Sequence, residues 1–372
     1  MKKIVFLMLS RGVGGIEKRM ATLYKYVAMN DFNIRVTFLI NRAQLDLIDT
    51  YATNTIPRNT EIVKFGLPYK QKFFGSSAFW YLVDYTCLAI TLILRFSRKK
   101  FKVAYFTKFS SLPFRKLVKS DLKVLSFVDS HNPSRILDSK RFKKILRESF
   151  RIDCLSEDLR KKVLELQDAD ERQVFSTPCS FIDYSETGIR EKNKVICFVG
   201  RFVDGKGIDI LLPALSAIID KHPNLEIKLL GAGEYEHQII EFIKRNKFEK
   251  IQVGFCKNPI GVLKESMIFL SLQEKENYPS QSLIEAMACG NAVIATDVGM
   301  TRKIVNDEVG LLIKRDSNEL IKAMDQLLSN ETSTLEKGRK AREKVIKEHT
   351  VERFWNYLRE SFFDNHENFG DQ

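Results

Sequence analysis

The sequence predicts an α/β protein with two domains, each built around a parallel β-sheet. Its 372 residues are enough to form two hydrophobic cores. Strand-like apolar runs alternate with helix-period segments along the chain, which is typical of βαβ units. The alternation is lost over residues 176–193 and begins again at Val195, so we expect the two domains to be joined there.

The first half of the chain contains short apolar runs with helical patterns between them. The runs predict strands over Ile4–Leu9, Ile34–Ile40, Ile62–Phe65, Val103–Phe106, Val124–Val128 and Ile152–Leu155. Two longer segments repeat their apolar residues at the period of a helix, and they predict helices over Glu17–Met29 and Trp80–Arg95.

Two apolar segments of this half resemble membrane-directed segments only superficially. The run Ile4–Leu9 is short for a signal peptide and Arg11 follows it, so it predicts a buried strand. Phe79–Leu94 contains Asp84 and is shorter than the roughly 20 residues that a spanning helix needs. It predicts a buried helix, with an interfacial membrane helix as the alternative.

The second half repeats the α/β alternation. We predict strands over Val195–Val199, Glu226–Leu230, Ile251–Gly254, Met267–Leu272 and Asn291–Thr296. Helical patterns separate them at 207–221, 234–246, 258–265, 280–289 and 317–329. A charged helix over Glu336–Glu348 then precedes an aromatic one over Val351–Phe363.

The charge of the protein is concentrated in its first half. Residues 1–190 carry 34 Lys and Arg against 19 Asp and Glu, whereas the remainder carries 26 against 28. This asymmetry indicates an anionic partner for the first domain, or else a solvated basic face without a partner. The six cysteines show no C-x-x-C pair and no histidines at metal-ligand spacing, which indicates reduced cytosolic thiols and argues against zinc.

Residues 274–299 are the most informative stretch for function. They predict an acidic loop, a helix over Ser280–Cys289, a stop at Gly290 and a buried strand. Glu276 lies in the loop and Glu285 in the helix. Two carboxylates beside a helix N-terminus suit a ligand with hydroxyls and phosphates, because the carboxylates accept from hydroxyls and the helix end attracts the phosphate.

Further ligand-binding features follow other predicted strands. Arg201 and Lys206 lie in a glycine-rich strand–loop–helix, where two cations and loop amides converge on an anion. The turn Gly231-Ala-Gly233 follows the next strand, at the carboxyl end where α/β sheets bind ligands. A loop with Gly14 and Gly15 follows the first strand, although its glycine spacing does not fit a dinucleotide fingerprint.

These motifs together resemble the nucleotide-sugar site of a large family of retaining glycosyltransferases with the type-B (GT-B) fold, the family 4-like or group 1 enzymes. That family has two glutamates separated by seven residues, then Ala-Met-Ala-x-Gly and a strand ending in Asp-x-Gly. Here eight residues separate Glu276 from Glu285, which we interpret as an insertion of one residue. Glu274 and Asn277 are the alternatives for the first position.

The resemblance implies two Rossmann-like domains that face a central cleft. The N-terminal domain, residues 1–180, would bind the acceptor, and the C-terminal domain, residues 190–348, would bind the nucleotide-sugar. Residues 349–372 would form a C-terminal helix that crosses back and packs on the N-terminal domain.

The resemblance also implies roles for individual residues. Arg201 and Lys206 would bind the donor diphosphate and offset the charge on the leaving nucleotide. Glu276 would hold the sugar hydroxyls. His131, just past a predicted strand, would contact the donor sugar near the reacting centre. The remaining donor contacts would come from Gly14, Gly15, Gly231, Gly233, Ser282, Leu283 and Glu285, the last of them at the ribose.

The activity implied is transfer of a sugar, with retention, from a UDP- or GDP-sugar to a growing bacterial surface polysaccharide, with no cofactor and no metal. We expect a lipid-linked acceptor and a cytoplasmic enzyme held at the inner face of the plasma membrane by its basic domain. A nonhydrolysing sugar-nucleotide epimerase and a non-catalytic nucleotide-sugar-binding protein are the alternatives. Nucleic acid is not an expected partner, because it would leave the two motifs unexplained.

Overall fold

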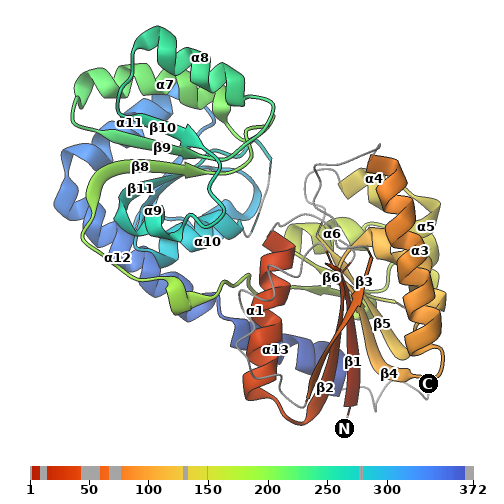
Figure 1. Cartoon of the computed structure of the whole chain (residues 1–372). Helices are drawn as coiled ribbons and strands as arrows, with labels where there is room; N and C mark the ends of the chain where they lie inside the picture. Colours follow the sequence, from red (N-terminus) through yellow and green to blue (C-terminus); the bar gives the residue numbers. More distant parts are fainter. Residues whose placement is uncertain are drawn as a thin grey trace. The chain divides into compact units, whose positions relative to one another are not determined.

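The computed structural model describes residues 2–8, 15–42, 59–66, 77–128, 133–148, 150–275, 278 and 280–364. The chain forms two compact units (Figure 1). The first unit combines Met1–Pro178 with Val351–Gln372, and the second is Cys179–Thr350. Each unit contains one parallel β-sheet, as the alternating pattern of the sequence predicts.

The sheet of the first unit has seven parallel strands in the order β3-β2-β1-β4-β5-β6-β7. They are β1 (Lys2–Met8), β2 (Ile34–Asn41), β3 (Thr60–Phe65), β4 (Lys100–Phe106), β5 (Lys119–Phe127), β6 (Arg151–Cys154) and β7 (Val174–Ser176). The helices are α1 (Gly15–Asn30), α3 (Ser77–Phe96), α4 (Pro133–Leu137), α5 (Lys140–Arg147) and α6 (Glu157–Leu164), with a 3₁₀ segment, η2 (Phe109–Lys116). The predicted strands and both predicted helices are present, with bounds that differ by a few residues.

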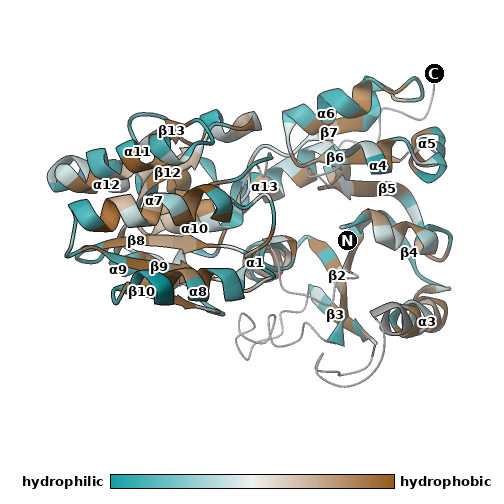
Figure 2. Cartoon of the chain, turned by 90° about the horizontal axis from the view of Figure 1, so that it is seen from above, coloured by the Kyte–Doolittle hydropathy of each residue, from teal (hydrophilic) through white to brown (hydrophobic). Residues whose placement is uncertain are grey.

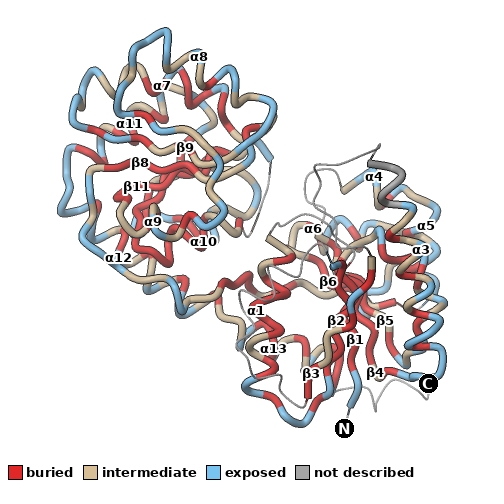
Figure 3. Tube along the Cα trace, in the orientation of Figure 1, coloured by how far each residue is buried: buried red, intermediate tan, exposed pale blue. Residues whose placement is uncertain are grey.

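Phenylalanine supplies much of the core of this unit. Phe6 of β1 stacks on Phe38 of β2 at 5.0 Å between ring centroids, and its ring lies 5.1 Å from that of Tyr105 on β4. Such aromatic pairs stabilise a core beyond the area they bury. In Figure 3 the strands of this sheet are predominantly buried, because crossover helices cover both faces of a parallel sheet.

The sheet of the second unit has six parallel strands in the order β10-β9-β8-β11-β12-β13. They are β8 (Asn193–Val199), β9 (Glu226–Leu230), β10 (Ile251–Gly254), β11 (Ser266–Ser271), β12 (Ala292–Thr296) and β13 (Gly310–Ile313). The helices are α7 (Ile208–Lys221), α8 (Glu236–Asn246), α9 (Ile260–Glu265), α10 (Gln281–Ala288), α11 (Ser317–Ser329) and α12 (Glu331–Glu348). Hydrophobic residues dominate strands such as β8 in Figure 2, whereas polar residues alternate with them on the helices.

The end of the chain packs on the first unit, which confirms the predicted C-terminal crossing. Helix α13 (Val351–Leu358) continues into a π-helical segment, η6 (Arg359–Asp364). The indole nitrogen of Trp355 donates to Asp31 Oδ2 at 2.9 Å, and the Tyr357 hydroxyl donates to Asp153 Oδ1 at 2.6 Å. The aromatic stripe of the sequence therefore becomes a buried contact surface.

Several elements differ from the sequence prediction. The sequence analysis does not predict the helices α4, α5 and α6, because each spans only five to eight residues, which is too short for a periodic pattern to indicate a helix. Strands β7 and β13 are only three and four residues long. The segment predicted as a linker begins inside β7 and then joins the second unit, because Ile182 is buried in its core. There Tyr184 donates to the carbonyls of Val345 and His349.

Helix α3 packs only one face on the first unit, so the prediction of a buried helix holds for that face alone. Asp84, Leu88 and Leu92 are buried, and the Asp84 carboxylate accepts from the Asn41 amide at 2.8 Å. Among the residues that the structure describes, no helix is both long and apolar enough to cross a membrane.

The buried contact between Asp31 and Trp355 predicts a large effect on the first unit. Asp31→Ala leaves the indole N–H without its acceptor and removes the ion pair with Arg359, so we expect the free energy of unfolding to fall by about 1–3 kcal/mol. Urea unfolding followed by tryptophan fluorescence measures this, because Trp80 and Trp355 both belong to the first unit.

Asp364→Ala is the matched control for that variant. It breaks only the ion pairs of the exposed Asp364 with Lys2 and Arg359, and we expect a loss below about 1 kcal/mol. Equal losses in the two variants would contradict a role for the buried contact in holding the C-terminal helix.

Candidate functional site

A small pocket lies at the carboxyl ends of β8 and β11 in the second unit. The strand order reverses between these two strands, since β9 and β10 lie on one side and β12 and β13 on the other. Open α/β sheets bind ligands at this switch point, where the loops leave in opposite directions. The pocket has a volume of about 120 Å³ and is lined by Phe198, Val199, Gly200, Arg201, Lys206, Leu270, Ser271, Gln273 and Ser282.

The loop that carries the two cations has a backbone that only glycine forms easily. Gly205 and Gly207 have φ values of +73° and +85°, in the left-handed region. A Cβ on Gly207 would overlap the backbone carbonyl of Leu272, and the Glu274 amide donates to the Gly205 carbonyl at 2.9 Å. The loop therefore lies directly against the segment that follows β11.

The Lys206 ammonium is held in the pocket by a neutral group. Its Nζ donates to Gln273 Oε1 at 2.7 Å. Burial and the neighbouring guanidinium of Arg201 lower the pKa of Lys206 to about 8. Without an anion, the repulsion between these two cations and the desolvation of one of them are unfavourable. A bound anion would offset both effects, and the cations would stabilise it in turn.

Helix α10 adds a third source of positive potential. It begins after the N-cap residue Ser280, and Ser282 in its first turn lines the pocket. The first N–H groups of a helix have no partner within the helix, and its dipole favours an anion there. Leu283 is 3% exposed and belongs to the core, so only its backbone is available to a ligand.

Glu285 is a buried carboxylate on the same helix. It is 6% exposed and lies one turn after Ser282, a spacing that places both residues on one side of α10. Acidic residues are rarely buried to this degree in a helix without a structural or functional reason. The structure therefore brings Arg201, Lys206, Ser282 and Glu285 into one region of the second unit.

The other predicted site residues that the structure describes do not line this pocket. Gly231 and Gly233 pack on protein backbone, because a Cβ on either would overlap the Gly200 or Phe202 carbonyl. Gly15 begins α1 in the first unit. The residues Gly14, His131, Glu276 and Asn277 lie outside the described residues. Of the three alternatives for the first carboxylate, Glu274 is described; it is exposed and lies beside Gly205.

Sequence analysis missed Ser271 and Gln273, which line the pocket from the end of β11. Neither belongs to a recognisable motif. Their only signal is that they follow a buried strand, at the edge where ligands of α/β proteins bind.

The second unit matches a known protein family. Residues 182–348 match the model described as "Glycosyl transferases group 1". The match covers almost all of the second unit, Cys179–Thr350, and just under half of the chain. The group 1 match includes the cation loop, the pocket and α10.

Curated relatives of this group 1 unit include two bacterial enzymes. The poly(ribitol-phosphate) alpha-N-acetylglucosaminyltransferase of Staphylococcus aureus is 26% identical over 167 residues, which cover 44% of this chain and 34% of that enzyme. A Campylobacter jejuni enzyme, the N-acetylgalactosamine-N,N'-diacetylbacillosaminyl-diphospho-undecaprenol 4-alpha-N-acetylgalactosaminyltransferase, is 29% identical over 145 residues, covering 38% of this chain and 39% of the enzyme. The chain thus matches well under half the length of each relative.

Solved structures extend the likeness to both units. The Anabaena protein HepE, in a complex with UDP and glucose, superposes with a TM-score of 0.72 at 17% identity, covering 98% of this chain and 100% of that one. At this identity the likeness shows the fold alone. The chain has the two-sheet GT-B fold of these glycosyltransferases, as its motifs predict.

The desolvated ammonium of Lys206 predicts a gain in stability when it is replaced. The pKa of Lys206 is about 8 when folded and near 10.5 when unfolded, so the protonated group opposes folding at pH 7. We expect Lys206→Met to raise the free energy of unfolding at pH 7 by about 1–3 kcal/mol. Because the folded protein loses the proton above pH 8 while the unfolded chain keeps it, this gain shrinks by pH 10.

Scanning calorimetry at pH 7 and pH 10 measures the difference. Lys303→Met, at an exposed lysine of the same unit, is the control and should leave the unfolding free energy nearly unchanged. A Lys206→Met variant that is no more stable than the wild type at pH 7 would contradict the conclusion that the buried ammonium of Lys206 destabilises the fold.

Proposed function

We propose that the protein is a retaining glycosyltransferase that takes a sugar from a UDP- or GDP-sugar and needs no metal. The observation that carries this proposal is the convergence of Arg201, Lys206 and the N-terminus of α10 on one pocket at the switch point. At about 120 Å³ the pocket is too small for a whole nucleotide-sugar, since ligand sites usually measure about 300–1,000 Å³. It suits the phosphate part of such a donor.

The chemistry follows from where charge develops. As the bond between the sugar and the diphosphate breaks, negative charge grows on the leaving phosphate. Arg201, Lys206 and the α10 amides are already in position to stabilise that charge, so little reorganisation is needed. These fixed cations supply the charge that a metal ion would otherwise provide. Retention follows if the acceptor hydroxyl attacks the face that the leaving group departs from and passes its proton to the phosphate.

The other residues would orient the donor. Glu285 would accept hydrogen bonds from the ribose hydroxyls, and Glu276 would accept them from the sugar. By the family resemblance, His131 would contact the donor sugar near the reacting carbon, and Gly14 and Gly15 would contact the phosphates. Gly231 and Gly233 allow the nucleotide to approach by keeping the 200–202 loop close to the strand ends. These roles rest on the family resemblance and belong to the proposal.

We further propose that the acceptor is a lipid-linked bacterial surface polysaccharide. The name of the Campylobacter relative places its acceptor sugar on diphospho-undecaprenol, and that of the Staphylococcus relative denotes a polymer of ribitol phosphate. Both names support a glycan or polyol acceptor. Such an acceptor would bring the enzyme to the inner face of the plasma membrane from the cytoplasm.

Helix α3 offers a surface for that membrane. Beside its buried face, a second stripe is exposed and apolar, with Leu82 at 65%, Ile90 at 51%, Ile93 at 52% and Leu94 at 76%. Exposed cations follow at the C-terminal end of the helix, including Arg95 and Arg98. An apolar stripe next to cations suits an interface with anionic lipid. The acyl chains solvate the apolar side chains, and the anionic head groups attract the cations.

A thermal-shift panel of UDP- and GDP-sugars without added metal tests the donor. A ligand at about 100 times its dissociation constant stabilises the protein by about 2.7 kcal/mol, which is a readable shift. We expect one nucleotide-sugar to give this shift and Glu285→Ala to lose it. Glu241→Ala, at an exposed glutamate of α8, is the control that keeps it. A shift that survives in Glu285→Ala would contradict the assigned role of this carboxylate.

The products then separate the alternatives. A glycosyltransferase releases nucleoside diphosphate only when an acceptor is present, whereas an epimerase changes the bound sugar without one. A protein that binds the nucleotide-sugar but yields neither product would be the non-catalytic alternative.

A liposome flotation assay tests the membrane surface. We expect binding to vesicles with anionic lipid that weakens with salt, because exposed charges are screened. The double substitution Ile90→Glu and Ile93→Glu should abolish it. Leu335→Glu and Ile346→Glu, at exposed apolar residues of α12, serve as the control pair that leaves binding unchanged. Equal flotation of the two double variants would overturn the role of α3.

A further inference from the structure

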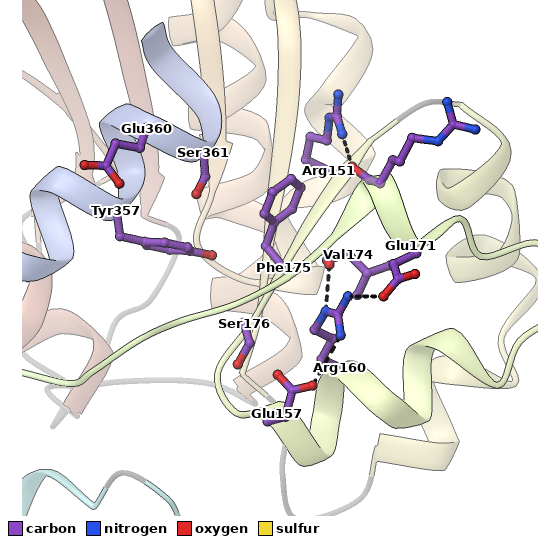
Figure 4. A pocket seen from close by; sticks show the side chains of 11 residues that line it. Arg151, Glu157, Arg160, Glu171, Val174, Phe175, Ser176, Tyr357, Glu360 and Ser361 are labelled. Carbon is purple, nitrogen blue, oxygen red and sulfur yellow. Dashed lines mark hydrogen bonds and ion pairs between the residues drawn. The ribbon is translucent and has the colours of Figure 1, made fainter. Parts of the chain in front are cut away.

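The first unit contains a second, larger pocket that the donor site does not use. It has a volume of about 610 Å³ and lies beside β7 (Figure 4). Residues of β6, η3 (Glu171–Gln173), β7, α6, α13 and η6 line it: Arg151, Glu157, Arg160, Glu171, Arg172, Val174, Phe175, Ser176, Tyr357, Glu360 and Ser361. Its volume falls in the range of small-molecule sites, about 300–1,000 Å³. It has room for a short oligosaccharide.

A network of hydrogen bonds fixes one wall of this pocket. Arg160 on α6 donates to the Val174 carbonyl at 3.0 Å, to Glu157 at 3.2 Å and to Glu171 at 3.0 Å. Arg151 donates to the Arg172 carbonyl. Because β7 is the edge strand of its sheet, these arginines also cover backbone carbonyls that would otherwise be open to another strand. The wall is therefore pre-formed.

The ionised groups of the pocket balance one another. Its cations are Arg151, Arg160 and Arg172, and its carboxylates are Glu157, Glu171 and Glu360. This balance contrasts with the excess of Lys and Arg over residues 1–190. A site for nucleic acid, phospholipid or another polyanion needs a surplus of cations. The pocket instead suits a neutral ligand with many hydroxyl groups.

A sugar ring has an apolar C–H face and a rim of hydroxyl groups, and the remaining lining groups of the pocket can contact both. Figure 4 shows the Phe175 ring in the middle, with Arg151 on one side and Tyr357, Glu360 and Ser361 on the other. The ring is braced by Phe362 at 4.9 Å and by Arg151 at 5.7 Å between its guanidinium carbon and the ring centroid. An aromatic ring accommodates the C–H face of a sugar, while hydroxyls, carboxylates and guanidinium groups bond its rim.

The lining of the pocket also reaches the carboxyl edge of its sheet. Ser176 ends β7 and Glu157 begins the helix that follows β6, so both lie at the carboxyl edge of the sheet. Arg151 and Arg172 lie at the opposite ends of these strands. A bound chain can therefore extend along β7 and end at the carboxyl edge, where α/β sheets bind ligands.

We propose that this pocket binds the completed part of the acceptor glycan, as a neutral oligosaccharide. The inference rests on the proposed function, because it assigns the pocket to the acceptor of that reaction. It adds a contact at a distance from the growing end, which would let the enzyme favour longer acceptors over single sugars.

Binding of short neutral oligosaccharides of different composition, measured by isothermal titration on the full chain, tests this inference. We expect one class to bind with little dependence on salt, and Ser361→Trp, which fills the pocket, to weaken that binding at least about tenfold. Asn356→Trp is the matched control, since Asn356 is exposed on α13 outside the pocket, and it should bind as the wild type does.

Three outcomes would overturn the inference: no neutral oligosaccharide binds, Ser361→Trp binds as the wild type does, or only sulfated oligosaccharides bind and salt removes them. The thermal shift with UDP- and GDP-sugars is measured on the same variants. Urea unfolding followed by tryptophan fluorescence, with the same midpoint in Ser361→Trp as in Asn356→Trp, shows that the first unit of the variant folds. If the wild type binds oligosaccharide but no nucleotide-sugar, the proposed function is wrong, whereas the binding of a neutral oligosaccharide in this pocket is still supported.

Discussion

The reversal of strand order between β8 and β11 is the constraint on which the site depends. Parallel strands need crossover connections, and in the second unit these connections leave β8 and β11 in opposite directions. The gap between their loops becomes the pocket, with Arg201 and Lys206 on one side and the start of α10 on the other. The chemistry of the site follows from this topology, since each group lies at a strand end or a helix start.

The site is built at a cost to the stability of the fold. Gly207 adopts a left-handed backbone so that the loop can lie on Leu272, and Lys206 keeps an ammonium in a place that disfavours charge. Both features make sense if an anion completes the site. A bound diphosphate would restore the solvation that Lys206 lacks and would use the unpaired amides of α10 at the same time.

The first unit relies on a different device, a set of buried polar groups under the C-terminal helix. Burial raises the pKa of Asp153, while hydrogen bonds from Tyr105, Tyr357 and Thr177 favour its charged form. Burial likewise raises the pKa of the Tyr357 hydroxyl, so it remains a donor. Because buried polar groups need partners, this network holds α13 in one position. It also places Tyr357 and Ser361 beside β7, where they line the second pocket.

From the sequence alone one can predict the alternation of strands and helices, the two sheets and the resemblance of the second unit to group 1 glycosyltransferases. The spacing of apolar residues is a property of each segment alone, and motifs such as the Arg201–Lys206 loop keep their spacing along the chain. Which side chains and loops come into contact depends on the tertiary fold. Gln273 reaches Lys206, and Gly231 meets Gly200, because adjacent strands end at the same sheet edge. The pocket beside β7 draws on residues near both 160 and 360, and no pattern along the chain links segments that far apart.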